Sequence, residues 1–374
     1  MVAPPPCGTV PRVDLPYLTA DIAGIGGALR TTDEDFVVDE EPAYLPSGSG
    51  DHVYVRIEKR GLTTRHAAAA IARALGVSER DVGIAGMKDR HAVTRQWLSL
   101  PPPLTPEAAQ AISVEGVTIL EASRHTNKLR TGHVRANRFR LVVRGIDDAT
   151  AGDRARQILS RLAEPPGAPN WYGEQRFGRD GDNAARGREL VLGTRKTTRD
   201  RKLDRLLVSS LQSELFNAWL RARIEDGLYR KVLAGDVLHK TNGGMFTCED
   251  AATDEARLLA GELVVTGPMF GDKMRRATDG SPAAERELQI LTAAGLDPGS
   301  FASVRAIAEG TRRDASIEVR EVAVTVTGEP STLEVGFALP GGAYATAVMR
   351  EVMKSEAAVD KTVAQRVDDT PEGA

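Results

Sequence analysis

Alternating apolar and polar residues mark several strands along the chain. In residues 51–59, apolar Val53, Val55 and Ile57 alternate with polar neighbours, which is the period-two pattern of a half-buried strand. Residues 29–40 predict an entry strand interrupted by an acidic turn. Further strands are expected at residues 93–100, 117–121, 137–143, 317–326 and 333–339.

Helical patterns lie between these strands at irregular intervals. Thr63 or Thr64 is a suitable N-cap for a helix over residues 66–75, and Gly76 follows where a left-handed residue is favoured. Longer helices are expected at residues 206–225 and 343–354. Strands with irregularly placed helices predict an α+β sheet architecture rather than a repeated βαβ unit.

A proline-rich break at residues 164–169 divides the pattern. Strand signals are sparse from there to about residue 315, and alternation then returns. The pattern predicts a sheet domain made of residues 1–164 and 311–354, split by a more helical insertion at residues 165–310. The last stretch, 355–374, is acidic and poor in large apolar residues, so a disordered tail is expected there.

Charge, cysteine content and the lack of long apolar runs exclude several classes of protein. With 49 Lys and Arg against 52 Asp and Glu, the net charge of −3 excludes a uniformly basic protein. The two cysteines, Cys7 and Cys248, exclude a disulfide framework and favour a reducing compartment. The first residues do not form a signal peptide, and no apolar run is long enough to span a membrane, so a cytoplasmic location is expected.

The basic residues are nevertheless clustered. Residues 122–144 hold seven Lys or Arg and no acid, residues 186–205 hold eight basic residues against three acidic ones, and residues 273–276 form a third cluster. Such segregation favours a polyanion over a merely solvated face, because each neutralised phosphate releases counterions. Phosphate loops, dinucleotide fingerprints and metal-ligand spacings do not occur, so no cofactor or metal is expected and nucleic acid is the favoured partner.

Residues 83–94, GIAGMKDRHAVT, carry the candidate chemistry. Asp89 lies between Lys88 and Arg90 just after an apolar, glycine-containing strand, so two cations favour its ionised form. On its own, this pattern also fits an ordinary surface turn.

The segment resembles the catalytic loop of the TruD family of pseudouridine synthases, G-x-K-D-[RK]-H-A-V-T-x-Q, which it matches from Gly86 to Gln96. Five other stretches typical of the family occur along the chain in the family's order, and the resemblance runs from about residue 28 to residue 354. These stretches are DFVVDE at 35–40, NKLR at 127–130 leading to NRF at 137–139, NWYGEQRFG at 170–178, SSLQSELFN at 209–217 and PGGAYAT at 340–346.

The resemblance implies a pseudouridine-synthase catalytic fold, a mixed and mainly antiparallel sheet with flanking helices, interrupted by a TruD-specific insertion domain. It implies isomerisation of a uridine in tRNA, in bacterial members usually uridine-13 of the D-arm, without a cofactor. We expect a monomer.

Asp89 would be the catalytic carboxylate. The residues expected to bind the substrate are Phe36, Lys88, Asn137, Phe139 and Tyr344. The family usually has Phe in place of Tyr344, whose hydroxyl must therefore find a partner or face solvent. The resemblance and the basic clusters together assign RNA-backbone contacts to Arg90, Lys128, Arg130, Arg199, Arg201 and Lys202.

Three other interpretations remain open at the level of sequence. A catalytically inactive RNA-binding or RNA-folding protein of this architecture would need the basic clusters but not Asp89. A phosphoryl transferase using Lys88 and Asp89 is disfavoured by the missing phosphate loop. A eukaryote-like member with several RNA substrates is disfavoured by the short chain.

Overall fold

The computed structural model describes residues 15–327 and 331–355 and divides the chain into two compact units. Within the described ranges, Asp21–Ala163 and residues 318–355 form one unit, here called the sheet unit. Glu164–Ile317 forms the other, the inserted unit, together with residues 15–20. Apart from Ser355, the tail expected to be disordered lies outside the described residues.

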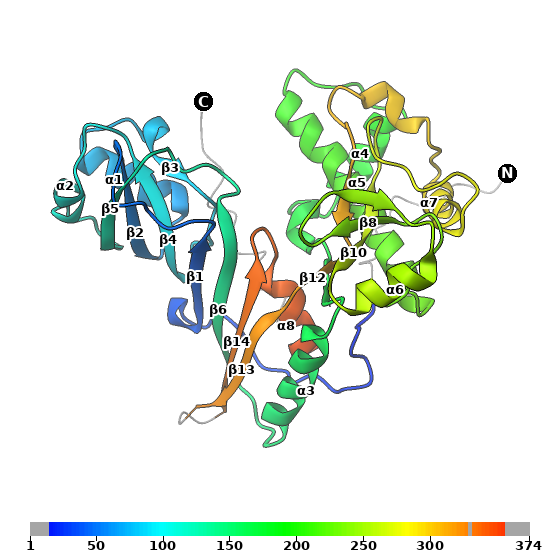
Figure 1. Cartoon of the computed structure of the whole chain (residues 1–374), viewed down its shortest axis with the longest axis horizontal. Coiled ribbons are helices and arrows are strands. Elements are labelled where there is room, and N and C mark those ends of the chain that lie inside the picture. The colour runs from blue at the N-terminus through cyan, green and yellow to red at the C-terminus, as the bar shows by residue number, and fades with distance from the viewer. Residues whose placement is uncertain (1–14, 328–330, 356–374) are drawn as a thin grey trace. The chain divides into compact units, whose positions relative to one another are not determined.

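An eight-stranded mixed sheet is the centre of the sheet unit (Figure 1). Its strand order is β13-β14-β6-β1-β4-β2-β5, and the short β3 pairs with β4. Only β1 and β4 run parallel among the described strand pairs. The strands are β1 (Phe36–Pro42), β2 (His52–Arg60), β3 (Gly83–Ile84), β4 (Val93–Leu100), β5 (Val117–His125), β6 (Val134–Arg144), β13 (Arg320–Val326) and β14 (Thr332–Pro340).

Four helices flank this sheet. They are α1 (Thr64–Ala74), α2 (Pro106–Gln110), α3 (Ala151–Ala163) and α8 (Ala345–Met353). The expected caps of α1 are confirmed, because the Thr63 side chain accepts from the His66 N–H and Gly76 has φ +66°. Ala67, Ala68 and Ile71 of α1 pack on Val53, Val55 and Ile57 of β2 in a fully buried core.

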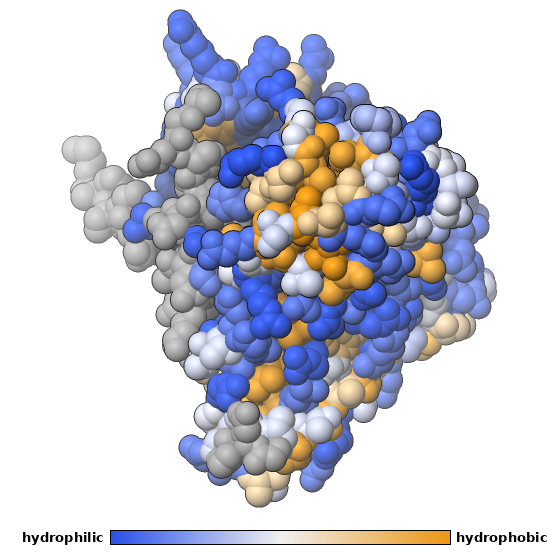
Figure 2. Space-filling model, turned by 90° about the vertical axis from the view of Figure 1, so that its left-hand side faces the viewer, coloured by the Kyte–Doolittle hydropathy of each residue, from blue (hydrophilic) through white to orange (hydrophobic). Residues whose placement is uncertain are grey.

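Figure 2 views the molecule from the side that carries α1, α2 and β5, and most of this face is hydrophilic. Hydrophobic surface gathers in one area of it. Partly buried Ile112, Val117 and Ile119 pack against the core to which α1 contributes. This core fixes the position of the chain between β2 and β4, where Asp89 lies.

The inserted unit has a core and a sheet of its own. Its four-stranded sheet has the order β11-β10-β8-β9, and β7 pairs with β12. Its helices are α4 (Asn183–Val191), α5 (Arg201–Glu225), α6 (Ala251–Leu259) and α7 (Pro282–Ala293). Its strands are β7 (Ala168–Pro169), β8 (Val237–Lys240), β9 (Met245–Thr247), β10 (Leu263–Met269), β11 (Thr311–Asp314) and β12 (Ser316–Ile317).

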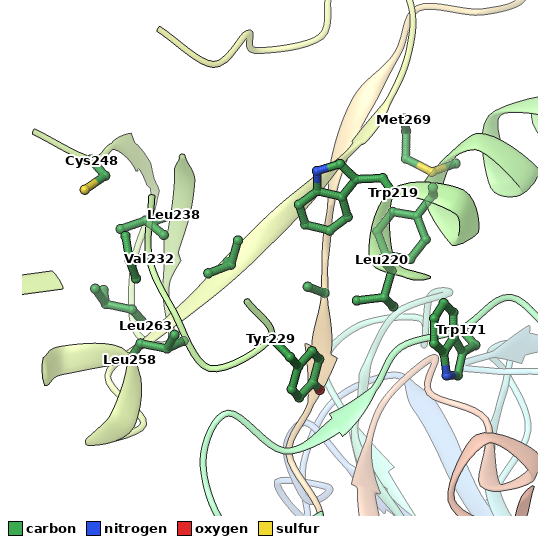
Figure 3. Close-up of a cluster of buried hydrophobic side chains, with 13 residues drawn as sticks. Trp171, Trp219, Leu220, Tyr229, Val232, Leu238, Cys248, Leu258, Leu263 and Met269 are labelled. Atoms are coloured by element: carbon green, nitrogen blue, oxygen red, sulfur yellow. The ribbon is translucent and has the colours of Figure 1, made fainter. Parts of the chain in front are cut away.

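Figure 3 shows one of the buried clusters of the inserted unit, to which Trp171, Trp219 and Tyr229 contribute large aromatic rings. Leu15 and Leu18 pack against the same cluster. Residues 15–20 therefore join the inserted unit, whereas the sequence pattern assigned them to the split sheet domain. Residues 311–317 also pair with strands of the inserted unit, so this unit extends past residue 310.

Other expectations about elements were incomplete. The sheet of the inserted unit was not predicted, because its strands are short and β10 is buried at six of its seven positions, which leaves no alternation. Helices α2, α3, α4, α6 and α7 were also not predicted. The entry strand begins only at Phe36, because Asp33–Asp35 form a 3₁₀ turn closed by the Asp35 carboxylate on the Thr32 N–H.

Candidate active site

Asp89 lies in the connection between β3 and β4, and its carboxylate is held by an arginine that is remote in sequence. Arg30 Nη2 donates to Asp89 Oδ2 at 2.7 Å, and the two side chains are 11% and 28% exposed. The Arg30 guanidinium also stacks over the Phe36 ring, 3.9 Å from its centroid. Arg30 therefore places a fixed positive charge on a half-buried carboxylate.

Sequence analysis missed Arg30. The residue lies 59 positions before Asp89, outside every basic cluster, and no local pattern links the two. Its φ of +61°, which is uncommon for a residue other than glycine, is visible only in the fold.

Lys88 is turned into the protein. Its Nζ forms an ion pair with Glu40 Oε2, and the two side chains are 7% and 0% exposed. The second Glu40 oxygen accepts from the Trp97 N–H at 3.2 Å. Lys88 thus ties the loop to β1 and β4.

Hydrogen bonds also fix the backbone of this loop from both sides. The Lys88 N–H donates to Thr64 Oγ1 at 2.8 Å, and the Thr64 hydroxyl donates to Gln96 Oε1 at 3.1 Å. Arg90 Nε donates to the Gly61 carbonyl at 3.1 Å, and buried Lys59 donates to the Asp89 carbonyl at 2.6 Å. Groups from β2, α1 and β4 therefore hold the backbone of the loop that carries Asp89.

The start of β1 is anchored by an ion pair between Asp35 and Arg144 of β6. Arg144 Nη2 donates to Asp35 Oδ1 at 2.8 Å, and Asp35 is 1% exposed. Burial raises the pKa of Asp35, but the guanidinium of Arg144 and the Thr32 N–H together lower it below the usual 3.8. This pair fixes Phe36 beside Arg30.

The aromatic residues predicted near the site differ in exposure. Phe36 is 3% exposed and meets half-buried Phe139 edge to face at 6.2 Å, and Phe139 lies 5.5 Å from buried Phe337. Phe139 pairs with Val38, and Asn137 pairs with Glu40, so both lie on the sheet face that carries Phe36. Tyr344 is 53% exposed just before α8, so its hydroxyl faces solvent.

Asn137 has an unused acceptor. The residue is 8% exposed, and its Oδ1 has no hydrogen-bond partner among the described residues. A buried amide oxygen without a partner is costly, so it is suited to accept a hydrogen bond from a bound molecule or a water.

The basic segment 122–144 meets acids that come from other strands. Arg135 and Arg138 pair with Glu41, Arg138 also pairs with Glu321, and Arg140 pairs with Glu334, at 2.7–3.2 Å. Lys128 donates to the Arg80 carbonyl at 2.7 Å, and Arg130 is exposed. Folding thus neutralises much of a cluster that contains no acid in sequence.

Part of the second cluster pairs with acids, through Arg186, Arg188 and Arg195, and part of it stays open to solvent. Arg199, Arg201 and Lys202 are exposed around the start of α5, and Asp200 is occupied as the N-cap, accepting from the Lys202 and Leu203 N–H groups. This part of the inserted unit offers three cations to an anion.

Clusters of metal-ligand residues and membrane-spanning helices are both absent from the described ranges. Over residues 15–327 and 331–355, no three or more His, Cys, Asp or Glu side chains gather as a metal site would require. None of the helices in these ranges combines the length and apolarity needed to cross a bilayer.

Known proteins match nearly the whole chain. The family model for tRNA pseudouridine synthase D (TruD) matches residues 12–199 and 194–352. The chain belongs to the TruD family. A TruD relative from Anaeromyxobacter dehalogenans strain 2CP-C, named tRNA pseudouridine synthase D, is 53% identical over 354 residues, or 92% of this chain and 98% of the relative. One from Thermus thermophilus with the same name is 42% identical over 362 residues, or 96% of this chain and 97% of the relative.

The TruD fold is matched as well. A crystal structure from Methanosarcina mazei, titled as a TruD protein, superposes with a TM-score of 0.77 at 22% identity and covers 91% of this chain and 96% of that one. The expected α+β fold with a mixed sheet and flanking helices is thereby confirmed.

Proposed function

We propose that this protein is a tRNA pseudouridine synthase that isomerises uridine-13 of the D-arm, with Asp89 as the catalytic carboxylate. Family membership over most of the chain supports the reaction class. The observation that carries the assignment of Asp89 is its ion pair with Arg30 inside the loop that matches the family's catalytic motif.

The reaction moves the ribose bond from N1 of uracil to C5. The C1′–N1 bond breaks, C1′–C5 forms, C5 loses its proton and N1 gains one, so no redox partner is needed. An ionised carboxylate is required whether Asp89 attacks as a nucleophile or removes a proton. The Arg30 guanidinium favours that ionised form.

The base must leave its stack to react, which costs a few kcal/mol. Half-buried Phe139 is the aromatic side chain we assign to stack on the flipped uracil, a contact worth about 1–3 kcal/mol. The free Asn137 Oδ1 suits the N3–H of the base, with exposed Tyr344 at the rim. Phe36 and Lys88 would not touch the base: Phe36 would act by holding Arg30, and Lys88 by its ion pair with Glu40.

Exposed cations would bind the RNA backbone. We assign this role to Arg130 in the sheet unit and to Arg199, Arg201 and Lys202 in the inserted unit. Arg90 and Lys128, which bond backbone carbonyls, would shape the surface of the sheet unit beside Arg130. We propose that the protein works in the cytoplasm as a monomer, without a cofactor.

Pseudouridine mapping of total RNA tests this function. Cells that lack the gene should lose pseudouridine at tRNA position 13, and the wild-type gene should restore it, whereas the Asp89→Asn gene should not. Loss at other sites only would contradict the assigned position. Unchanged RNA, with tRNA still bound by the purified protein, would instead favour a catalytically inactive RNA-binding protein.

A further inference from the structure

Lys59 is a fully buried cation directly behind the catalytic loop. It lies near the end of β2, and its residue is 0% exposed. Its Nζ donates to two backbone carbonyls, those of Asp89 and Leu62, each at 2.6 Å. The ammonium therefore joins the loop that carries Asp89 to the connection between β2 and α1.

Neither of these acceptors is a carboxylate. In the described part of the chain, no Asp or Glu oxygen lies within ion-pair distance of Lys59 Nζ. Burial of an ammonium without a bonded carboxylate is costly, and an apolar side chain would avoid that cost. A cation kept here at the expense of stability is expected to serve the loop that it contacts.

We propose that Lys59 is a positioning residue for the isomerisation: its ammonium fixes the main chain of Asp89 and places a second positive charge behind the carboxylate that Arg30 contacts. This inference rests on the proposed function of Asp89.

The surrounding charges support such a role. Burial lowers the pKa of Lys59 to about 8, the negative charges of Asp89 and Asp33 oppose that shift, and the positive charge of Lys88 adds to it. Each of these neighbours has a partner of its own: Arg30 on Asp89, Glu40 on Lys88 and His91 near Asp33.

Stability and activity should respond to alkaline pH in opposite directions. Above about pH 8 the folded protein releases the Lys59 proton, whereas the unfolded chain keeps it up to the ordinary 10.5. The unfolded state then binds more protons, so the free energy of unfolding rises with pH in this window. The positive charge behind Asp89 is lost in the same window, so turnover should fall.

The test is the pH dependence of kcat on an unmodified tRNA transcript for the wild type, Lys59→Met and Lys59→Arg. At pH 7 we expect Lys59→Met to lower kcat by about tenfold to hundredfold at an unchanged KM, the effect of losing buried hydrogen bonds from a charged group. The wild-type kcat should fall near pH 8. Lys59→Arg, which keeps its charge, should lack this fall.

Lys354→Met is the matched control. Lys354 also donates to a backbone carbonyl, that of Ile22 at 2.7 Å, and burial lowers its pKa as well. This variant should keep the wild-type kcat and pH profile.

Two results would overturn the inference: wild-type kcat in Lys59→Met, or a wild-type alkaline fall in Lys59→Arg. If Lys59→Met is too unstable to assay, the alkaline pH profile of Lys59→Arg decides the question by itself. Melting temperatures give a second readout that does not depend on activity. From pH 8 to 10 the melting temperature of the wild type should rise relative to that of Lys59→Met. A difference that stays constant over this range would count against a buried ammonium. A wild-type protein without synthase activity would instead refute the proposed function.

Discussion

At the scale of single residues, the site depends on what holds Asp89 rather than on Asp89 alone. Arg30 contacts the carboxylate, Lys59 contacts the carbonyl, and the neighbouring Lys88 is bound through both its side chain and its N–H. Sequence analysis named Asp89 and Lys88 because they lie in one motif. It could not name Arg30, which comes from a segment 59 residues away.

Asp89→Asn should abolish turnover while leaving the fold intact. The amide keeps the size of the side chain and one acceptor for Arg30 but removes the charge that a nucleophile or base needs. Tritium release from tRNA labelled at C5 of uridine should fall to background, with tRNA affinity and melting temperature close to wild type. Substantial turnover by a well-folded variant would end the assignment.

Arg30→Met should lower kcat by about tenfold to hundredfold, because a charge-assisted hydrogen bond to the half-buried Asp89 is lost. Arg30→Lys, which keeps a positive charge, should recover part of the lost kcat. Arg56→Met is the control, since it removes a comparable 2.9 Å pair with Asp39 in the same sheet without touching Asp89. Its kcat should stay within about twofold of wild type, as expected for a more exposed pair. Equal losses in both methionine variants would point to a general effect of ion pairs on the sheet.

At the scale of elements, the loop after β3 is built together with the start of α1. The two adjacent threonines there have different tasks: Thr63 caps the helix, whereas buried Thr64 bonds the Lys88 N–H and Gln96. Either threonine fitted the cap at the level of sequence. The role of Thr64 becomes visible only in the folded structure, where the loop packs against the start of the helix.

Thr63→Ala should cost about 1 kcal/mol of stability, the usual value of an N-cap, at an unchanged kcat. Thr64→Val should cost about 1–3 kcal/mol, because it leaves the half-buried Lys88 N–H without its acceptor, and should also lower kcat by loosening the loop. Urea unfolding and tritium release measure the two effects. A normal kcat in Thr64→Val would show that this bond serves stability only.

At the scale of the whole molecule, charge is distributed differently from the way the sequence suggests. The acid-free segment 122–144 receives acids from β1, β13 and β14 when the sheet forms. Arg199, Arg201 and Lys202, in a segment that does contain acids, stay exposed. These three exposed cations are therefore the stronger candidates for RNA contact.

Reversing Arg199, Arg201 and Lys202 to Glu together should weaken tRNA binding and flatten its dependence on salt, because each phosphate contact contributes to the salt slope. The control reverses Arg221, Lys231 and Lys240, which are spread over the inserted unit and change the net charge equally. Affinity measured from about 50 to 200 mM salt separates a local contact from a net-charge effect. A wild-type affinity and slope in the first variant would identify that cluster as a solvated face.

The sequence by itself determined the reaction class, the motif residue Asp89 and the strands whose apolar positions alternate. These features depend on short motifs and on the pattern of residues that are close together in the chain. Strands buried on both faces, such as β10, gave no alternation and were found only in the fold. The tertiary structure also decided which charges remain free and which groups reach Asp89. The physical reason is that an ion pair or a buried hydrogen bond depends on distance in space, and β-sheet pairing brings together residues such as Arg138 and Glu321 that lie 183 positions apart.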